Sequence, residues 1–382
     1  MDTNLSETVL ITGITGFVGS QIANNLLNRG FKVKGTVRSL KNKEKLAPIY
    51  ELPNQNNLQL VEADLLDEAC WDNIVSDVTY ILHVASPFII SIPKNEDELI
   101  QPAVKGTLSV LKAAAKNDKI KHIVITSSIA SIFSCYTSGK RNYTEEDWPN
   151  MDKIMPYNKS KALAEKEAWN FYKKEKEIRE KSNQKMFKLT TICPGYIFGP
   201  SLVKTGFASG DIIRQIMTGE ALGIPNVKFC IVDVRDIAES HVRAMLSDIT
   251  DGQRYICVSE KGLWGKDISK LLIDNYGKYG YKCTKMNVPN FVIRMSSLFN
   301  KQAAATLPLL DADNNFDNSS IIDNLNSIIK KSGKKQNSNS NINSNDDNNI
   351  IISKESMNKY ILSKLKENIK NYKINKLEIC LV

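Results

Sequence analysis

Three glycines recur at intervals of three in TGITGFVG, residues 12–19, directly after the apolar run of residues 9–11. An interior glycine costs about 0.5–1 kcal/mol relative to alanine, so Gly13, Gly16 and Gly19 need a structural reason. Apolar residues then follow at helical spacing, which predicts a strand, a glycine turn and the start of a helix. Because helix N-termini attract phosphate, we expect a dinucleotide-binding turn here; an ordinary tight turn is the alternative.

Apolar runs alternate with helical patterns over most of the first 200 residues. Strands are expected at TVLIT, FKVKGTVR, LQLVEADL, VTYILHVAS, KHIVITSS and KLTTICPGYIFGP. Helices are expected from the glycine turn to near Gly30, over residues 99–117 and over residues 157–177. Near-continuous apolar strands separated by helices are typical of a parallel sheet covered on both faces. We therefore predict an α/β fold with a doubly wound parallel sheet of the Rossmann type.

The alternation loosens after Pro200, as expected of a smaller C-terminal substrate lobe. CIVDVRDIAESHVRAM and QRYICVS are expected to return to the main sheet. The predicted Rossmann domain covers residues 5–200 plus about 228–258, and the predicted substrate lobe covers about 201–227 and 259–310.

A low-complexity tail is predicted for residues 311–382. Asn and Ser make up ten of the fourteen residues 336–349, which leaves too few apolar groups to offset the entropy of ordering. Helical periodicity returns over residues 350–382. A small tail helix is one alternative, but we expect this segment either to bind a partner as a helix or to form no stable structure.

The 382-residue chain carries a net charge of +9, but its basic residues are dispersed, which does not favour nucleic-acid binding. No run approaches the ~18 apolar residues of a membrane span, and the acidic N-terminus MDTNLSE is unlike a signal peptide. Seven scattered cysteines show neither disulfide nor metal-ligand spacing. We expect a cytoplasmic monomer or homodimer that binds a small molecule, without a metal, a membrane or nucleic acid.

The end of the second expected strand, GTVRS, indicates which dinucleotide is bound. An NAD site usually has a carboxylate there, which accepts a hydrogen bond from the ribose 2′-hydroxyl. Arg38 holds that position and can meet a 2′-phosphate with two charge-assisted hydrogen bonds. Lys41, Lys43 and Lys45 follow, and at least two of them are expected to be solvated. NADP(H) is the predicted cofactor, and Asp64 either accepts from the adenine amino group or caps the next helix.

YNKSK places Tyr157 and Lys161 four residues apart on one face of a predicted helix. An ammonium group beside a phenol lowers the phenol pKa from about 10, which makes the pair usable in acid–base catalysis. The pair follows VITSS, at the carboxyl end of the fifth strand, where open parallel sheets bind ligands. Ser128 there can donate to a substrate carbonyl oxygen while Tyr157 donates the proton.

At these motifs the chain resembles an extended short-chain dehydrogenase/reductase of the dihydroflavonol 4-reductase, cinnamoyl-CoA reductase and yeast-type methylglyoxal/aldehyde reductase group. The resemblance covers roughly residues 7–310, in VLITGITGFVG, GTVRS, HVASPF, PAVKGTLSVLKAA, VITSSIAS, YNKSKALAEKEAW, CPGYIFGP and DVRDIAESHV. It implies that Ser128, Tyr157 and Lys161 form the catalytic triad, with Tyr157 as the general acid in reduction. Lys161 would lower the pKa of Tyr157 and bond the nicotinamide ribose.

The resemblance also implies which residues contact the cofactor. Ala85 would line the nicotinamide ribose, and Pro194 and Ile197 would line the nicotinamide ring. The complete expected cofactor-binding set is Gly13, Gly16, Phe17, Val18, Gly19, Arg38, Lys45, Asp64, Leu65, Ala85, Tyr157, Lys161, Pro194 and Ile197. The expected activity is NADPH-dependent reduction of an aldehyde or ketone to an alcohol.

Three other functions compete with this prediction. A 3β-hydroxysteroid dehydrogenase is compatible with the same sequence. A nucleotide-sugar epimerase or dehydratase shares the catalytic triad but usually retains NAD, against which Arg38 argues. An NADP-binding scaffold without turnover would not need an intact triad.

Other polar residues are expected to be structural. His83 and His122 lie in predicted strands and should be packed, whereas His241 is expected on a helix surface. The charged side chains of DVRD, residues 233–236, are expected to form a polar cluster beside the cleft, because buried charges need partners.

Overall fold

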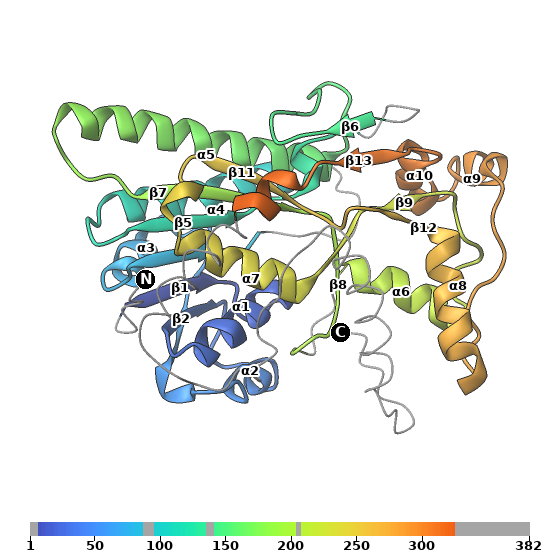
Figure 1. The fold of residues 1–382 in the computed structure, drawn as a ribbon, viewed down its shortest axis with the longest axis horizontal. Helices are drawn as coiled ribbons and strands as arrows, with labels where there is room; N and C mark the ends of the chain where they lie inside the picture. The colour runs from blue at the N-terminus through green and yellow to red at the C-terminus, as the bar shows by residue number, and fades with distance from the viewer. Residues whose placement is uncertain (1–6, 87–94, 135–140, 204–207, 325–382) are drawn as a thin grey trace, which may run out of the picture.

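The computed structural model describes residues 7–86, 95–134, 141–203 and 208–324 (Figure 1). Its centre is a sheet of seven strands in which every neighbouring pair is parallel. The order across the sheet is β3 (Leu58–Glu62), β2 (Lys32–Val37), β1 (Thr8–Thr12), β4 (Tyr80–His83), β5 (His122–Thr126), β7 (Lys188–Pro194) and β11 (Gln253–Cys257). The predicted doubly wound α/β fold is confirmed.

Helices cover both faces of the sheet (Figure 1). One face carries α1 (Phe17–Asn28), α2 (Lys43–Tyr50) and α7 (Val234–Met245), and the other carries α3 (Glu68–Val75), α4 (Asp97–Ala115) and α5 (Pro156–Lys181). Because strand side chains alternate between faces, Val9 and Ile11 of β1 enter the first core and Leu10 enters the second. All three are fully buried, and each such burial contributes about 1.5–3 kcal/mol.

The two helices that carry the main motifs begin and end at recognisable residues. Helix α1 begins after Gly16 and is followed by Gly30, whose φ of +83° is the left-handed conformation that ends many helices. Helix α5 begins with Pro156, a favoured first residue, and runs to Lys181, beyond the predicted end at 177. Arg179 holds this extra turn, because its guanidinium donates to the carbonyl of Ala115 on α4 and to that of Lys185 at 2.7 Å.

The segment predicted as a single strand over KLTTICPGYIFGP is two strands. β7 ends at Pro194, and β8 (Tyr196–Phe198) pairs instead with β10 (Ile231–Asp233) in a separate two-stranded sheet. The break is at Gly195, where a Cβ atom would lie 2.0 Å from the carbonyl oxygen of Cys230. QRYICVS does return to the main sheet as β11, but the expected return of CIVDV is wrong, since its strand is β10.

A smaller lobe follows at one end of the sheet (Figure 1). It contains α6 (Ala208–Thr218), α8 (Gly265–Tyr276), α9 (Asn290–Ser296), α10 (Lys301–Thr306) and the antiparallel pair β9 (Lys228–Phe229) and β12 (Leu263–Trp264). Its own apolar core includes Phe198, Ile216 and Leu272. Short 3₁₀ turns are η1 (Gln55–Asn57), η2 (Ile129–Ser131), η3 (Asp248–Thr250), η4 (Gly277–Tyr279) and η5 (Leu307–Leu309). The exact division into domains stays a prediction.

The chain remains part of the folded unit beyond residue 311, where the sequence predicts the tail to begin. β13 (Asn314–Phe316) pairs in parallel with β6 (Arg141–Tyr143), and the ring of Phe316 stacks on that of Tyr143 with centroids 5.1 Å apart. Ile321 and Ile322 are buried in the core that also contains α1 and α7. The Asn/Ser-rich run and residues 350–382 lie outside the described residues.

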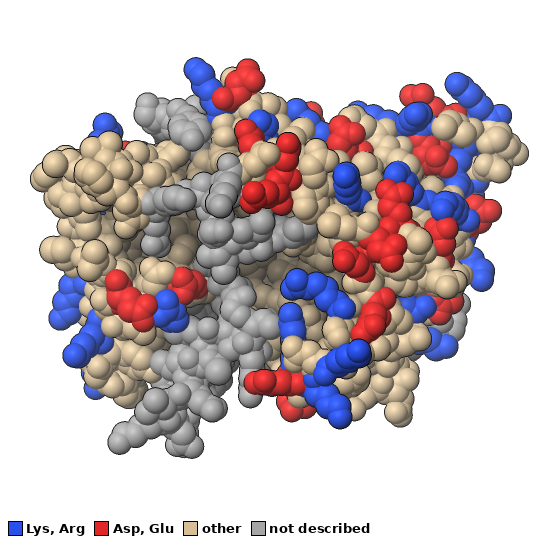
Figure 2. Space-filling model, turned by 180° about the vertical axis from the view of Figure 1, so that it is seen from behind, with Lys and Arg blue, Asp and Glu red and all other residues tan. Residues whose placement is uncertain are grey.

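On the face shown in Figure 2, basic and acidic side chains are interspersed, with no continuous basic field. Within the described ranges, no helix combines the length and the apolar character needed to cross a membrane.

These contacts predict different outcomes for two truncations. A chain ending at residue 329 keeps Phe316, Ile321 and Ile322, and its melting temperature should stay within about 2 °C of the full-length value. A chain ending at residue 312 exposes the core that these three side chains cover. It should therefore melt at least about 10 °C lower, because each lost burial costs about 1.5–3 kcal/mol. Thermal melts of the three purified chains provide the measurement. A large loss for the chain ending at 329 would show that the tail stabilises the fold.

Candidate active site

The glycine turn joins β1 to α1 at the carboxyl edge of the sheet. Gly13 has φ +71°, and its N–H donates to the hydroxyl of Thr36 at 3.1 Å. The N–H of Gly16 donates to the carbonyl of Gly13 at 2.9 Å, and Gly16 then caps α1 without a side-chain acceptor. A Cβ atom at Gly19 would lie 2.4 Å from the carbonyl oxygen of Gly13. The turn is therefore folded tightly onto the first turn of α1, which includes the buried Phe17 and Val18 and forms a helix N-terminus suited to an anion.

The end of β4 lies against this turn. The hydroxyl of Thr12 accepts hydrogen bonds from the N–H groups of Val84 at 3.0 Å and Ala85 at 2.9 Å. A Cβ atom at Gly13 would lie 3.1 Å from the Cβ atom of Ala85, closer than an ordinary van der Waals contact, so a side chain there would require Ala85 to shift. β1 and β4 are also where the strand order reverses, the point at which open α/β sheets bind ligands. Two of the predicted cofactor contacts, Gly13 and Ala85, are thus neighbours.

Arg38 and Lys45 lie on the β2 side of the glycine turn. Arg38 is exposed directly after β2, two residues beyond the Thr36 that receives the hydrogen bond of Gly13. Within the described part of the chain, its guanidinium contacts no carboxylate. Lys45 is partly exposed in the first turn of α2. Both side chains are therefore available to an anion next to the turn.

Asp64 and Leu65 follow β3, next to β2 in the sheet. The carboxylate of Asp64 accepts from the N–H of Leu66 at 2.9 Å, which closes a local turn. The suggestion that Asp64 caps the next helix is wrong, because Asp67 caps α3 through the N–H of Ala69. Leu65 packs toward α4, where a Cβ atom at Gly106 would meet its side chain at 3.1 Å.

Ser128, Tyr157 and Lys161 come together from two elements. Ser128 follows β5 and caps η2, with its hydroxyl accepting from the N–H of Ala130 at 3.1 Å. Tyr157 and Lys161 lie in the first two turns of α5, and the Tyr157 hydroxyl is hydrogen-bonded to Ser128. All three residues are partly exposed. A proton donor, a second hydroxyl and a cation therefore share one site at the carboxyl edge of β5.

Burial controls the protonation states in this site. Burial raises the pKa of Tyr157 to about 12, although the Ser128 hydrogen bond acts in the opposite direction. Burial lowers the pKa of Lys161 to about 8, against the effect of the Glu165 carboxylate. The sequence predicts that the ammonium lowers the pKa of Tyr157; in this structure the pKa is raised instead, because removing a phenolate from water costs more than Ser128 offsets. Near neutral pH Tyr157 is protonated and Lys161 is mostly charged.

Pro194 and Ile197 lie on the other side of β5. Pro194 ends β7, which pairs with β5 in the register Thr126 to Ile192, and is buried. Ile197 belongs to β8 and is partly exposed. Pro194 therefore ends the strand next to β5, and Ile197 follows that strand.

The histidines are all buried and neutral. His83 and His122 are packed in strands as predicted, and burial lowers the pKa of each to about 4. The expected surface position of His241 is wrong, because its side chain is fully buried on α7. Its Nδ1 donates to the carbonyl of Ile237 at 2.8 Å, and its Nε2 accepts from the hydroxyl of Thr126 at 2.7 Å. The sequence shows that His241 lies on an amphipathic helix. It does not show that β5 packs against this turn of the helix and places Thr126 beside the imidazole ring.

The DVRD segment contains one of the expected pairings, between Asp233 and Arg235, whereas Oδ2 of Asp236 is buried without a hydrogen-bond partner among the described residues. Arg235 forms an ion pair with Asp233 at 2.6 Å, and burial, together with the charge of Asp233, raises the pKa of Asp236 to about 7. Sequence reasoning missed a second buried charged pair, Glu165 with Arg254. Glu165 follows Tyr157 and Lys161 at the same spacing of four, a signal that the YNKSKALAE segment contains.

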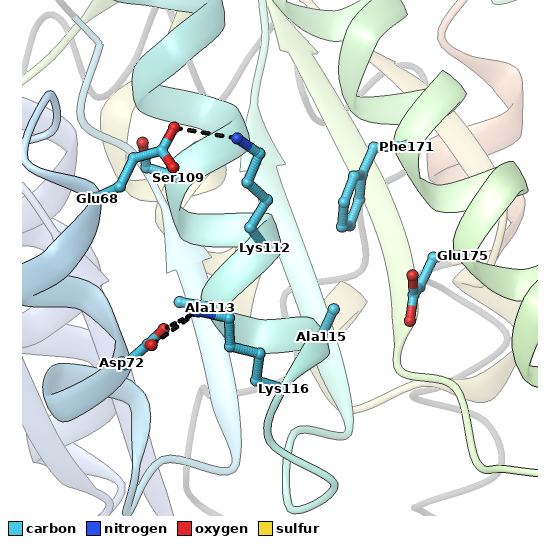
Figure 3. Close-up of a pocket in the computed structure, with 9 residues that line it drawn as sticks. All are labelled: Glu68, Asp72, Ser109, Lys112, Ala113, Ala115, Lys116, Phe171 and Glu175. Carbon is cyan, nitrogen blue, oxygen red and sulfur yellow. Dashed lines mark hydrogen bonds and ion pairs between the residues drawn. The ribbon is translucent and has the colours of Figure 1, made fainter.

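A hollow of about 340 Å³ lies elsewhere, between α3, α4 and α5 (Figure 3). Its two lysines are paired, Lys112 with Glu68 and Lys116 with Asp72. The last turns of α4 line it, and α4 runs back toward the amino edge of the sheet, away from the residues above. No predicted site residue lines this hollow.

The site described above, a glycine turn at the switch point of a Rossmann sheet with a Ser/Tyr/Lys group beside it, defines the class as a dinucleotide-binding α/β enzyme. Residues 10–286 match the 3-beta hydroxysteroid dehydrogenase/isomerase family. The chain belongs to this family of extended short-chain dehydrogenases/reductases, which confirms the predicted resemblance and the enzyme class, an oxidoreductase.

Named relatives agree with this assignment. A cinnamoyl-CoA reductase of Medicago truncatula is 32% identical over 283 residues, 72% of this chain and 82% of the relative. A putative NADPH-dependent methylglyoxal reductase of Candida albicans is 33% identical over 273 residues, 66% of this chain and 78% of the relative. The structure of Gre2 from Candida albicans in complex with NADPH has the same fold, with a TM-score of 0.66, 24% identity and coverage of 94% of this chain and 99% of that one.

The packing of the turn predicts a strong effect of Gly19→Ala. The added methyl group would lie 2.4 Å from the Gly13 carbonyl oxygen, so the turn must open. Overpacking of this kind costs about 1–3 kcal/mol, and the melting temperature should fall by several degrees while NADPH binding weakens about tenfold or more. Fluorescence titration with NADPH and a thermal melt provide the measurements. Gly277→Ala is the control, because its nearest neighbour would be in ordinary contact at 3.8 Å. Unchanged NADPH affinity in Gly19→Ala would contradict the role of the turn.

Proposed function

We propose that this protein reduces an aldehyde or ketone to an alcohol with NADPH, and that Tyr157 supplies the proton. The observation that carries the proposal is the hydrogen-bonded Ser128–Tyr157 pair with Lys161, at the carboxyl edge of β5 and one strand from the Gly13–Ala85 contact. NADPH, when bound, would supply the hydride that adds to the carbonyl carbon. The proton from Tyr157 would complete the alcohol and leave Tyr157 as a phenolate.

Each residue of the triad has a distinct part in this reaction. The hydroxyls of Ser128 and Tyr157 would hold the carbonyl oxygen, where negative charge develops as hydride adds. Tyr157 is protonated near neutral pH, as a general acid must be, because burial raises its pKa to about 12. The ammonium of Lys161 would then stabilise the phenolate that remains after proton transfer.

The choice of NADP(H) over NAD is supported by Arg38 and Lys45. Arg38 stands where an NAD site has its carboxylate, is exposed, and has no anionic partner among the described residues. Two named relatives point the same way, because one is described as NADPH-dependent and the structure of Gre2 was determined with NADPH. We propose that the turn holds the pyrophosphate and Arg38 the 2′-phosphate.

The remaining cofactor contacts are proposed from their positions along the same edge. Phe17 and Val18 follow the turn, and Asp64 and Leu65 follow β3. Pro194 ends β7, the strand next to β5, and Ile197 comes shortly after it. The lobe around α6 and α8 is the proposed source of substrate specificity. The scattered cysteines support a reducing, cytoplasmic location, and we propose a monomer or homodimer.

A 3β-hydroxysteroid dehydrogenase is the second candidate, because the matching family is named for that activity. A nucleotide-sugar epimerase is disfavoured by Arg38, since epimerases of this fold usually retain NAD. A panel of aldehydes, ketones and 3-oxo or 3β-hydroxy steroids, followed by the change in NADPH absorbance, separates these activities.

Tyr157→Phe should lower turnover of the best carbonyl substrate by about 10²–10⁴, the usual range for a positioned acid. Binding of NADPH should stay within about threefold, because the phenyl ring retains the packing and only the hydroxyl is lost. Tyr172→Phe is the matched control on the same helix, since it loses a hydroxyl that bonds Asp251 at 2.9 Å. It should cost about 1 kcal/mol of stability and leave turnover unchanged. Near-normal turnover of Tyr157→Phe would remove Tyr157 from the mechanism.

Arg38→Ala should raise the KM for NADPH about ten- to hundredfold and leave the KM for NADH nearly unchanged. Only NADPH carries the 2′-phosphate, and a charge-assisted contact contributes about 1.5–3 kcal/mol. Steady-state kinetics with both cofactors provide the measurement. Arg29→Ala, at the far end of α1 and paired with Glu239, is the control that removes a cation elsewhere. If the preference for NADPH persists in Arg38→Ala, another residue binds the phosphate.

A further inference from the structure

Glu165 is a fully buried carboxylate whose oxygens accept hydrogen bonds from several chain segments. Its donors are the hydroxyls of Ser127 and Ser131, both at 2.5 Å, the hydroxyl of Thr191 at 2.8 Å, the indole of Trp169 at 3.3 Å and the guanidinium of Arg254 at 2.7 and 3.3 Å. A carboxylate with this many donors is held in one orientation.

The donors belong to the elements that carry the candidate site. Ser127 directly precedes Ser128, and its own N–H donates to the carbonyl of Ile192 on β7 at 2.7 Å. Ser131 ends η2, the turn that Ser128 caps. Thr191 lies on β7, which ends at Pro194. The carboxylate therefore connects the carboxyl ends of β5 and β7 to helix α5.

On α5 itself, Glu165 stands one turn beyond Lys161 and two turns beyond Tyr157, on the same helix face. Its negative charge acts on Lys161 in the direction that favours the ammonium form. Among the described residues, His83 of β4 also interacts electrostatically with this ammonium, and burial keeps His83 neutral. Glu165 is thus an acidic group on α5, the helix that also carries Tyr157 and Lys161. Its charge opposes the loss of the Lys161 proton.

Arg254 of β11 makes the buried charge of Glu165 tolerable. Burial alone would raise the pKa of Glu165, but the charge and hydrogen bonds of Arg254, with the two serine hydroxyls, hold it below its usual value. The guanidinium also lies 3.8 Å from the ring centre of Trp148 and donates to the carbonyls of Glu145 and Asp147. A buried ion pair is a costly way to fill a core, so a purely packing role is a poor explanation for it.

We propose that Glu165 is a positioning residue for carbonyl reduction, which holds Ser128 at the end of β5 in place relative to Tyr157 and keeps Lys161 in its charged form. The inference rests on the proposed function. In this role Glu165 touches neither substrate nor cofactor, and it acts through Ser127, Ser131 and Lys161.

Glu165→Gln tests this directly. The amide keeps the size of the side chain but replaces one of the two acceptor oxygens with an NH₂ group, which cannot accept a hydrogen bond. Turnover should fall about ten- to hundredfold, while NADPH binding stays within about threefold. The alkaline limb of the kcat/KM profile should move to lower pH, because Lys161 loses the charge that favours its ammonium form while Arg254 remains. Glu239→Gln on α7 is the matched control, since Glu239 is paired with Arg243 of the same helix and with Arg29 at the end of α1, and the change should leave turnover and the pH profile unchanged.

Ser127→Ala provides a milder variant, should Glu165→Gln fail to fold with Arg254 left unpaired. It removes the bond between Glu165 and the residue before Ser128, together with the 3.1 Å hydrogen bond between the hydroxyls of Ser127 and Ser131, and turnover should fall about fivefold or more. Ser240→Ala, another buried serine whose hydroxyl bonds a backbone carbonyl on α7, is the control and should stay within about twofold.

The outcomes separate the two proposals. Lower turnover in Glu165→Gln or Ser127→Ala, with NADPH binding and both controls intact, supports the positioning role. If both variants only melt at lower temperature, with wild-type turnover and pH profile, Glu165 is structural and the inference is overturned. If the wild-type protein binds NADPH but reduces no carbonyl compound on the panel, the proposed function fails and the positioning role fails with it.

Discussion

Seven parallel strands that point the same way place seven carboxyl ends along one edge of a single sheet, and the candidate site depends on this constraint. Parallel pairing requires a crossover between strands, and the crossover helices cover both faces. With both faces covered, the loops at the carboxyl edge bring together distant parts of the chain at a surface that a ligand can reach. The register sets Thr12 opposite His83 and His83 opposite Ile125, so the glycine turn, Ala85 and Ser128 follow one another along that edge.

Burial is the second physical factor that organises the site. It is the largest cause of the pKa shift at Tyr157, at Lys161 and at the histidine of β4. Each of these groups is moved toward its neutral form, which keeps the phenol protonated and leaves the lysine sensitive to nearby charge. Glu165 is the exception, because its hydrogen bonds and the guanidinium of Arg254 outweigh the cost of burial. The charges that remain near the site are therefore those with specific partners.

The later part of the chain attaches to the sheet through close backbone approaches. Gly195 allows the chain to leave β7 against the carbonyl of Cys230, and β8 and β10 then connect the sheet to the lobe. β13 returns to pair with β6, and Ile321 and Ile322 close the core beside α1 and α7. The pairing of β13 with β6 joins segments that are more than a hundred residues apart in the chain, such as Tyr143 and Phe316.

The sequence by itself determined the features that depend on local patterns. The alternation of apolar runs and helices predicts the parallel sheet, the spacing of glycines predicts the turn at the start of α1, and YNKSK predicts the pair on α5, because periodicity and turn chemistry are local properties. Only the tertiary structure decided what depends on contacts between distant residues. The break at Gly195, the buried position of His241 against Thr126, and the carboxylate of Glu165 among its donors each require a partner that no local pattern specifies. The same holds for the pKa of Tyr157, because desolvation depends on everything packed around a group and not on its neighbours in sequence.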